Sequence, residues 1–124
     1  PLISTKRLQE AFNRFSKGSF DVVFPVGRYA SPILRSYKVN EEYAAVMNFP
    51  EYEAMRSQDL YDSYFDAGQF YWGAADAWLQ EKLIYSKTSV VLKLPRHRVQ
   101  DIDNQEDWIR AEWLFRALQA ERQS

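Results

Sequence analysis

The sequence predicts an α/β protein with an open, mostly parallel sheet, and three observations support this class. The apolar run FDVVFPV at 20–26 follows a segment with helical spacing, and this helix-then-strand order is typical of parallel sheets. A second apolar run, SVVLKLP at 89–95, ends at a proline. An amphipathic helix follows it, so the order of elements indicates the second half of an open α/β sheet.

Residues 5–16 predict the first helix, because their apolar positions have the i, i+3, i+4, i+7 spacing of one helical face. These residues are Leu8, Ala11, Phe12 and Phe15. Ser4 or Thr5 can cap the start of the helix, and Gly18 ends it. The run at 20–26 is apolar almost throughout, which predicts a strand buried on both faces.

The region from 28 to 59 changes character and predicts a hairpin that leaves the main sheet. Its β-like pieces, ILRSYKV and YAAVMNF, join across NEE and are broken by Pro32 and Pro50. Farther on, YFDAGQFYWG at 64–73 predicts a strand, and AADAWLQEK predicts a short helix. The last helix is expected over 105–122, with an apolar side. That side consists of Trp108, Ala111, Leu114, Phe115 and Leu118.

The composition gives no support to a nucleic-acid or membrane partner. The chain has 16 basic and 17 acidic residues and a net charge of -1, so no global field attracts a polyanion or an anionic lipid surface. Because there is no Cys, disulfides and thiolate metal sites within the chain are excluded. No apolar run approaches the ~20 residues that span a bilayer, and we expect a cytoplasmic protein. The chain begins PLIST without Met, so we expect it to be cut from a longer protein.

Asp101 and Asp103 are the first candidates for chemistry. In an extended segment they would point to one face, with Ile102 turned into the core, and two hard oxygen ligands suit Mg²⁺. The other interpretation is a helix cap, because Asp103 with Glu106, or Asn104 with Asp107, has the spacing of a capping box. The residues alone favour the cap and leave the metal site open.

Arg56, in the polar segment MRSQDL, is a candidate for binding a substrate carboxylate in a bidentate way. An ordinary surface arginine is the alternative. In DAGQFYW, Gly68 allows a close approach of backbone or ligand, and Gln69 and Tyr71 carry polar tips beside it. The alternative there is packing of Phe70 and Trp72 in the core with exposed polar neighbours.

Three segments together resemble one enzyme family. They are PLIS before a capped helix, MRSQDLYDSYFDAGQFYWG, and SVVLKLPRHRVQDIDNQEDWIRAE. The chain resembles the C-terminal half of the acylneuraminate cytidylyltransferases, the CMP-sialic acid synthetases, and looks nearest to their bacterial pseudaminic acid branch. The resemblance implies a Rossmann-like nucleotide-binding sheet, with residues 1–124 as the C-terminal part of one cytidylyltransferase domain. The resemblance also implies that the natural protein has an N-terminal nucleotide-binding half, with the glycine-rich loop for CTP phosphates, that is missing from this sequence.

The resemblance also implies an activity and residue roles. Family enzymes transfer CMP from CTP to the anomeric hydroxyl of a nonulosonic acid and release pyrophosphate, with Mg²⁺ held by the aspartates that match Asp101 and Asp103. The sugar-acid pocket is expected to include Arg35, Arg56, Gln58, Gly68, Gln69 and Tyr71. Residues 28–58 look like the arm by which the family forms homodimers, and that arm reaches into the partner's active site.

Two departures from the sialic-acid members favour a pseudaminic-type substrate. In SPILRSYK the place of the arm's lysine is taken by Leu34, with Arg35 as the nearest cation, and Ala67 stands where an asparagine is usual. We expect this chain alone to be inactive. The rival functions are a non-catalytic dimerisation or sugar-acid-binding module, and a related nucleotidyltransferase that uses another sugar acid.

Overall fold

The structure is a computed structural model that describes residues 2–82 and 84–123. The chain forms two compact units, one made of Pro1–Gly27 and Asp66–Ser124 and the other of Arg28–Phe65. The first unit holds the buried strands and the long helices, and the second holds a hairpin with short 3₁₀ turns. No helix in the described part of the chain is long and apolar enough to cross a membrane.

Helix α1 (Thr5–Lys17) confirms the first predicted helix and packs against the sheet. Ala11 is fully buried, and the Phe12 ring lies against Trp72 with the ring centroids 5.0 Å apart. The indole Nε1 of Trp72 donates a hydrogen bond to the Leu8 carbonyl at 3.2 Å. Ser4 occupies the N-cap position, yet among the described residues its hydroxyl makes no capping hydrogen bond. Helix and sheet are therefore joined by both packing and a side-chain hydrogen bond.

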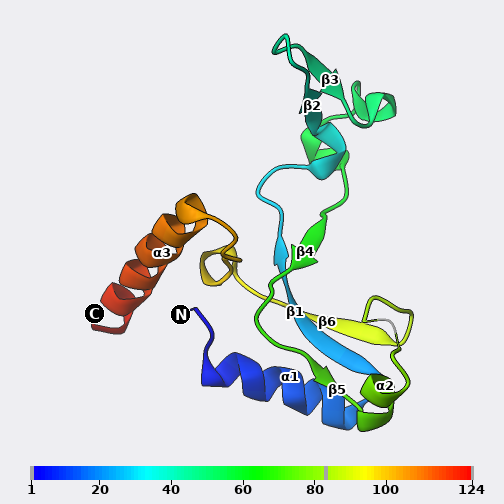
Figure 1. Ribbon diagram of the computed structural model, residues 1–124, viewed down its shortest axis with the longest axis vertical. Helices are drawn as coiled ribbons and strands as arrows, with labels where there is room; N and C mark the ends of the chain where they lie inside the picture. Colours follow the sequence, from blue (N-terminus) through cyan, green and yellow to red (C-terminus); the bar gives the residue numbers. More distant parts are fainter. Residues whose placement is uncertain (1, 83, 124) are drawn as a thin grey trace. The chain divides into compact units, whose positions relative to one another are not determined.

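Strand β1 (Val22–Arg28) is the centre of the main sheet and is buried from Val22 to Gly27, as the apolar run predicts. It lies between β4 (Tyr64–Asp66) and β5 (Trp72–Gly73), and β6 (Ser89–Lys93) also pairs with it. The β1·β6 pair is parallel, with Val22 opposite Ser89 and Val26 opposite Lys93 (Figure 1). The β1·β5 pair is antiparallel.

The predicted α/β class is confirmed, whereas the described strands do not form a mostly parallel sheet. Parallel strands need a long crossover, usually a helix. Helix α2 (Ala75–Leu79) lies in the connection from β5 to β6, and β6 is parallel to β1. The chain reaches β5 from β4 through a short turn, without a helix, and β5 pairs with β1 in the antiparallel sense.

The strand expected over 64–73 is wrong as a single element. The chain forms β4, turns at Gly68, and then forms β5. Gly68 has φ +62°, a left-handed conformation that breaks a strand and that glycine adopts without strain. The turn places the polar residues of DAGQFYW at a bend, and their surroundings there define the candidate site.

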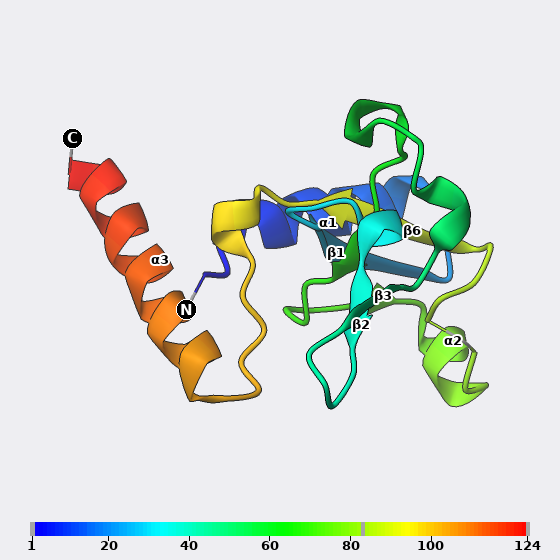
Figure 2. The ribbon, with the colours of Figure 1, turned by 90° about the horizontal axis from the view of Figure 1, so that it is seen from above.

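The second unit confirms the predicted hairpin. Strands β2 (Tyr37–Val39) and β3 (Ala45–Met47) pair antiparallel, with Tyr37 opposite Met47 (Figure 2). The side chain of Asn40 closes the turn by accepting hydrogen bonds from the backbone N–H groups of Glu42 and Ala44. The unit also contains three 3₁₀ turns, Ile33–Arg35, Pro50–Tyr52 and Ser57–Asp59.

Helix α3 (Gln105–Gln123) confirms the last predicted helix, but its apolar side is only partly buried. Ala111 and Leu118 are buried, whereas Trp108 and Phe115 are exposed. Trp113, which the predicted face did not include, is 66% exposed. The helix therefore presents more apolar surface than the described part of the chain covers. A 3₁₀ turn, Arg96–Arg98, lies between β6 and α3.

Candidate functional site

The turn at Gly68 is the geometric centre of the candidate site. The Oδ1 atom of Asp66 accepts a hydrogen bond from the Gly68 N–H at 2.8 Å, which forms the turn that side chains of this type favour. A Cβ atom built at Gly68 would lie 3.1 Å from Oδ1 of Asp101. The absence of a side chain therefore allows the Asp101 carboxylate to lie directly against this backbone.

A cavity of about 230 Å³ borders the turn, and we call it the Gly68 cavity. Three residues predicted from the sequence, Gly68, Gln69 and Asp101, line it. The remaining lining residues are Leu2, Ile3, Ala67, Gln100 and Ile102. The structure thus brings residues that are some thirty positions apart in the sequence into one concave site, with a carboxylate and two amide side chains on its wall.

Gln69 has a structural partner in this cavity. Its amide Nε2 donates a hydrogen bond to the Arg98 carbonyl at 2.6 Å. This bond ties the Gly68 turn to the segment that carries Asp101. Gln69 therefore helps to hold the two walls of the Gly68 cavity together, beyond the substrate-binding role expected from the sequence.

Asp101 and Asp103 lie in an irregular segment rather than a strand, and both are exposed. The expectation that Ile102 turns into the core is wrong, because Ile102 is 37% exposed. Val99, 3% exposed, fills the core position of this segment instead. Strand alternation therefore gives no basis for placing the two carboxylates on one face.

The helix-cap interpretation is confirmed for one of its two pairs. Oδ1 of Asn104 accepts a hydrogen bond from the Asp107 N–H at 3.0 Å, which caps the start of α3. The Asp107 carboxylate in turn accepts from the Asp103 N–H at 3.2 Å and from the Gln100 side chain at 3.1 Å. The cap uses the backbone of Asp103, and its carboxylate plays no part in these bonds.

The donor chemistry of Asp101 and Asp103 fits Mg²⁺. Oδ1 of Asp101 accepts a hydrogen bond from the Ile102 N–H at 3.2 Å. Within residues 2–82 and 84–123, neither carboxylate forms an ion pair with Lys or Arg, and no group of three or more His, Cys, Asp or Glu side chains could hold a metal. Two carboxylates are nevertheless sufficient for Mg²⁺, which fills its other positions with water and phosphate oxygens.

Tyr71 belongs to a cluster that the sequence does not reveal. Oδ2 of Asp66 accepts hydrogen bonds from the hydroxyls of both Tyr71, at 2.5 Å, and Tyr85, at 2.8 Å. The hydrogen bond to Asp66 raises the pKa of Tyr71 above its usual range, and burial adds to the shift. The same carboxylate raises the pKa of Tyr85. We call Asp66, Tyr71 and Tyr85 the Asp66 cluster.

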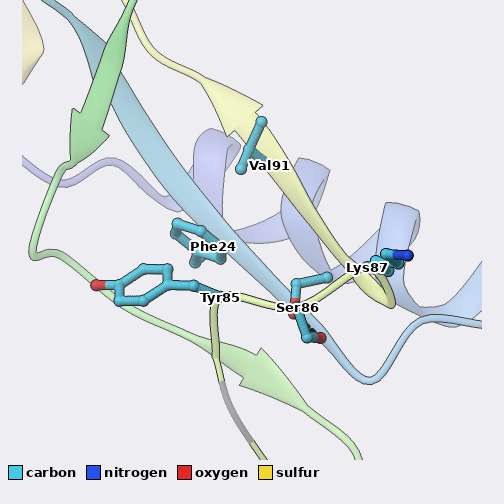
Figure 3. A pocket seen from close by; sticks show the side chains of 6 residues that line it. Phe24, Tyr85, Ser86, Lys87 and Val91 are labelled. Atoms are coloured by element: carbon cyan, nitrogen blue, oxygen red, sulfur yellow. Dashed lines mark hydrogen bonds between the residues drawn. The ribbon is translucent and has the colours of Figure 1, made fainter.

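Both tyrosine rings of the Asp66 cluster rest on Phe24 of β1. The ring centroids lie 6.0 Å from Phe24 for Tyr71 and 5.6 Å for Tyr85. Figure 3 shows the Tyr85 ring beside Phe24, with its hydroxyl directed away from Ser86 and Lys87. A second, open cavity of about 470 Å³ lies along this face. Its lining is Phe24, Tyr85, Ser86, Lys87, Ser89 and Val91.

The other predicted site residues, Arg35, Arg56 and Gln58, belong to the second unit. Nη2 of Arg35 donates to the carbonyls of Glu53 and Met55, each at 2.8 Å, so this guanidinium fastens the loop that precedes Arg56. Arg56 forms a two-point pair with Asp59, at 2.9 and 3.4 Å, while its side chain stays 72% exposed. Gln58 is exposed in the adjoining 3₁₀ turn.

Asp66 and Tyr85 are the site residues that sequence reasoning missed. Asp66 carried a readable signal, since an aspartate two residues before a glycine favours this kind of turn. Tyr85 carried none, because it comes from an irregular segment before β6 and meets Asp66 only through the fold.

Comparison with known proteins gives consistent matches. Two pseudaminic acid cytidylyltransferases from Campylobacter jejuni are each 35% identical over 94% of this chain and 50% of their own length. A Helicobacter pylori protein, named as a pseudaminic acid cytidylyltransferase and UDP-2,4-diacetamido-2,4,6-trideoxy-beta-L-altropyranose hydrolase, is 35% identical over 82% of the chain and 19% of its own length.

No family model matches the chain. The chain spans about half the length of the Campylobacter relatives, so the alignment compares it with one half of those enzymes. The identity is nevertheless spread over nearly all of this chain. On this evidence, the chain belongs to the family of the pseudaminic acid cytidylyltransferases.

Proposed function

We propose that the whole protein transfers CMP from CTP to the anomeric hydroxyl of a pseudaminic-type nonulosonic acid and releases pyrophosphate. The observation that carries this proposal is the 35% identity, over 94% of the chain, to pseudaminic acid cytidylyltransferases. The Gly68 cavity adds support, because three residues expected to bind substrate or metal line it together. The proposed substrates are therefore CTP and the sugar acid, with Mg²⁺ as the metal ion.

The chain is proposed to be the C-terminal part of one cytidylyltransferase domain. The parallel β1·β6 pair would join further parallel strands to complete an open, Rossmann-like sheet. With four glycines in all, the chain could hardly build a glycine-rich loop for the phosphates of a nucleotide. An N-terminal half would have to supply that loop, so the chain alone would be inactive.

Asp101 and Asp103 are proposed to hold Mg²⁺. A divalent cation there would neutralise negative charge on the phosphates as the pyrophosphate departs. The bare backbone of Gly68 leaves room for Asp101 at the cavity wall. The cap of α3, through Asn104 and Asp107, fixes the backbone of Asp103.

Arg56 is proposed to bind the carboxylate of the sugar acid. Its guanidinium already donates two hydrogen bonds to the Asp59 carboxylate, and a substrate carboxylate has the same shape and charge. Binding would therefore exchange one carboxylate for another, and both sites are exposed enough for the exchange. Gln58, two residues farther along the chain, and Arg35, whose guanidinium donates to the loop before Arg56, would complete this part of the pocket.

The homodimer is proposed to form through residues 28–58. The hairpin strands expose apolar side chains that a partner could cover, namely Tyr37, Val39 and Val46, each more than half exposed. The free backbone N–H and C=O groups along the edge of an exposed strand can also pair with another chain.

The proposal is tested with the whole protein, CTP, Mg²⁺ and pseudaminic acid. We expect CMP-sugar formation that falls at least about 100-fold in Asp101→Asn and in Asp103→Asn, since charge stabilisation of this kind is worth several kcal/mol. Asp76→Asn, an exposed aspartate in α2, is the matched control and should keep normal activity. Normal Mg²⁺-dependent activity in both site variants would refute the metal assignment.

A further inference from the structure

We infer that the Asp66 cluster is a specificity corner of the sugar-acid site, where the two phenol oxygens accept hydrogen bonds from hydroxyl or amide N–H groups of the substrate. The inference rests on the proposed function and adds Asp66 and Tyr85 to its binding residues. It follows from how the hydrogens of the cluster are used.

The hydrogens of both phenols are committed to Asp66. An ionised carboxylate has no hydrogen to give, so it can only accept. Oδ1 of Asp66 accepts from Gly68 at 2.8 Å, and Oδ2 accepts from Tyr71 at 2.5 Å and from Tyr85 at 2.8 Å. Each phenol has one hydrogen, and in these two bonds it is donated to Asp66. What remains on each phenol oxygen is acceptor capacity alone.

The Asp66 cluster is also accessible to a ligand, and packing holds its two rings in place. Tyr71 is 39% exposed and Tyr85 is 69% exposed, so a ligand can reach them. Both rings pack against Phe24, which is itself 6% exposed in the buried strand β1. A corner with fixed acceptors binds a donor of matching position and penalises a ligand that lacks it, because its polar groups then stay unpaired.

The negative charges around the cluster restrict which chemical groups of a ligand can bind there. Asp66 carries its negative charge at the centre of the cluster, and Asp101 lies at the neighbouring Gly68 turn. A carboxylate or phosphate placed on the phenols would meet both carboxylates and find no donor. The acid group of the substrate therefore belongs elsewhere, and a neutral donor such as a hydroxyl or acylamido N–H fits the corner.

The test compares steady-state constants of the whole protein with CTP and pseudaminic acid. In Asp66→Asn the amide oxygen can keep the bond from the Gly68 N–H, and the amide nitrogen then takes the place of Oδ2. This nitrogen cannot accept, so both phenols lose their acceptor and must turn their hydrogens away from it. We expect the KM for pseudaminic acid to rise about tenfold or more, because an unmatched polar pair in a binding site costs about 1–3 kcal/mol. The KM for CTP should change less than about twofold. Asp66→Glu keeps both acceptors and should recover part of the loss.

Tyr85→Phe is an independent test if Asp66→Asn folds poorly. It removes one acceptor and leaves Asp66 in place, so the KM for the sugar acid should rise about threefold or more, the value of one neutral hydrogen bond. Tyr61→Phe, at a tyrosine that is 64% exposed in the second unit, is the matched control and should leave both KM values unchanged.

A readout without substrate checks the hydrogen-bond arrangement itself. Tyrosinate absorbance, followed with pH, should include two phenols that ionise above the ordinary value of 10.0 in the wild type and whose pKa returns toward that value in Asp66→Asn. An active wild type whose sugar-acid KM is unchanged in both Asp66→Asn and Tyr85→Phe overturns the inference and leaves the proposed function standing. A wild type that transfers no CMP overturns both.

Discussion

At the scale of single residues, Gly68 has two independent reasons to be glycine. Its φ of +62° is costly for a residue with a side chain, and a Cβ atom would press on Asp101 at 3.1 Å. The sequence indicated the glycine as a place of close approach, and the structure identifies the approaching group as a carboxylate. Residues that share a strand or loop motif could be grouped from the sequence, whereas Asp66 and Tyr85 meet only in the fold.

Gly68→Ala should therefore lower both stability and activity. We expect a loss of about 1 kcal/mol or more in the free energy of unfolding, from the left-handed backbone alone. A double-mutant cycle with Asp101→Ala, measured by denaturant unfolding, separates this strain from the contact with Asp101. If Gly68→Ala caused no loss of stability in either the wild-type or the Asp101→Ala background, the tight turn would not exist in solution.

Asn104 and Asp101 should have separable effects, because one caps a helix and the other is proposed to bind metal. Asn104→Ala removes the hydrogen bond to the Asp107 N–H and should cost about 1 kcal/mol of stability. It should leave the Mg²⁺ concentration for half-maximal activity unchanged. Asp101→Asn should raise that concentration with little effect on stability. Thermal unfolding and a Mg²⁺ titration of each variant make the comparison, and a reversed pattern would contradict this division of roles.

At the scale of elements, the sequence predicted the helices and the buried strands because each has a strong period or a continuous apolar run. It failed over 64–73, where a local turn formed by Asp66 and Gly68 overrides an aromatic-rich, strand-like composition. It also placed Ile102 in the core by strand alternation, although that segment is not a strand. Both of these failures lie in segments that border the Gly68 cavity, where the backbone is irregular.

Asp21, the residue before β1, links the start of that strand to the segment that leads into β6. Its carboxylate accepts hydrogen bonds from Thr88 Oγ1 at 2.6 Å and from Lys82 Nζ at 3.0 Å. The Thr88 hydroxyl and then Lys82 hold the pKa of Asp21 below its ordinary value of 3.8. A carboxylate with a lowered pKa in the folded state stabilises the fold above its unfolded pKa, and that stability is lost as the pH falls through the folded pKa.

Thr88→Val should raise the pKa of Asp21 toward 3.8. The variant should be less stable than wild type at neutral pH, and the difference should shrink as the pH falls below that value. NMR titration of the Asp21 carboxyl and unfolding curves between neutral pH and pH 2 measure both effects. Thr5→Val, at the exposed start of α1, is the control and should leave the pKa of Asp21 unchanged. An unaltered Asp21 pKa in Thr88→Val would show that the Thr88 hydroxyl does not hold the carboxylate.

At the scale of the whole molecule, the chain leaves much apolar surface exposed. On α3, Trp108 is 52% exposed and Trp113 is 66% exposed, while Phe115 lines a small cavity of about 190 Å³ with Ile102 and Ala111. Large exposed apolar patches are typical of surfaces that another chain segment or subunit covers. The sequence could predict the apolar face of this helix, but not how much of it stays uncovered.

The chain by itself should accordingly self-associate. Light scattering should give a mass above that of the monomer, and Trp113→Glu together with Trp108→Glu should shift it toward the monomer. The matched control, Arg110→Glu on the same helix, changes charge without removing apolar surface and should not have this effect. A monodisperse wild-type monomer would contradict the expectation.

The central claim is that the whole protein is a cytidylyltransferase for a pseudaminic-type acid, and the most direct measurement is product formation. The whole protein, CTP, Mg²⁺ and pseudaminic acid are incubated together, and the CMP-sugar and pyrophosphate are quantified by mass spectrometry and a coupled assay. The account predicts equal amounts of the two products, with weaker turnover of N-acetylneuraminic acid. Sugar-acid binding without release of pyrophosphate, or no reaction with either acid, would contradict it.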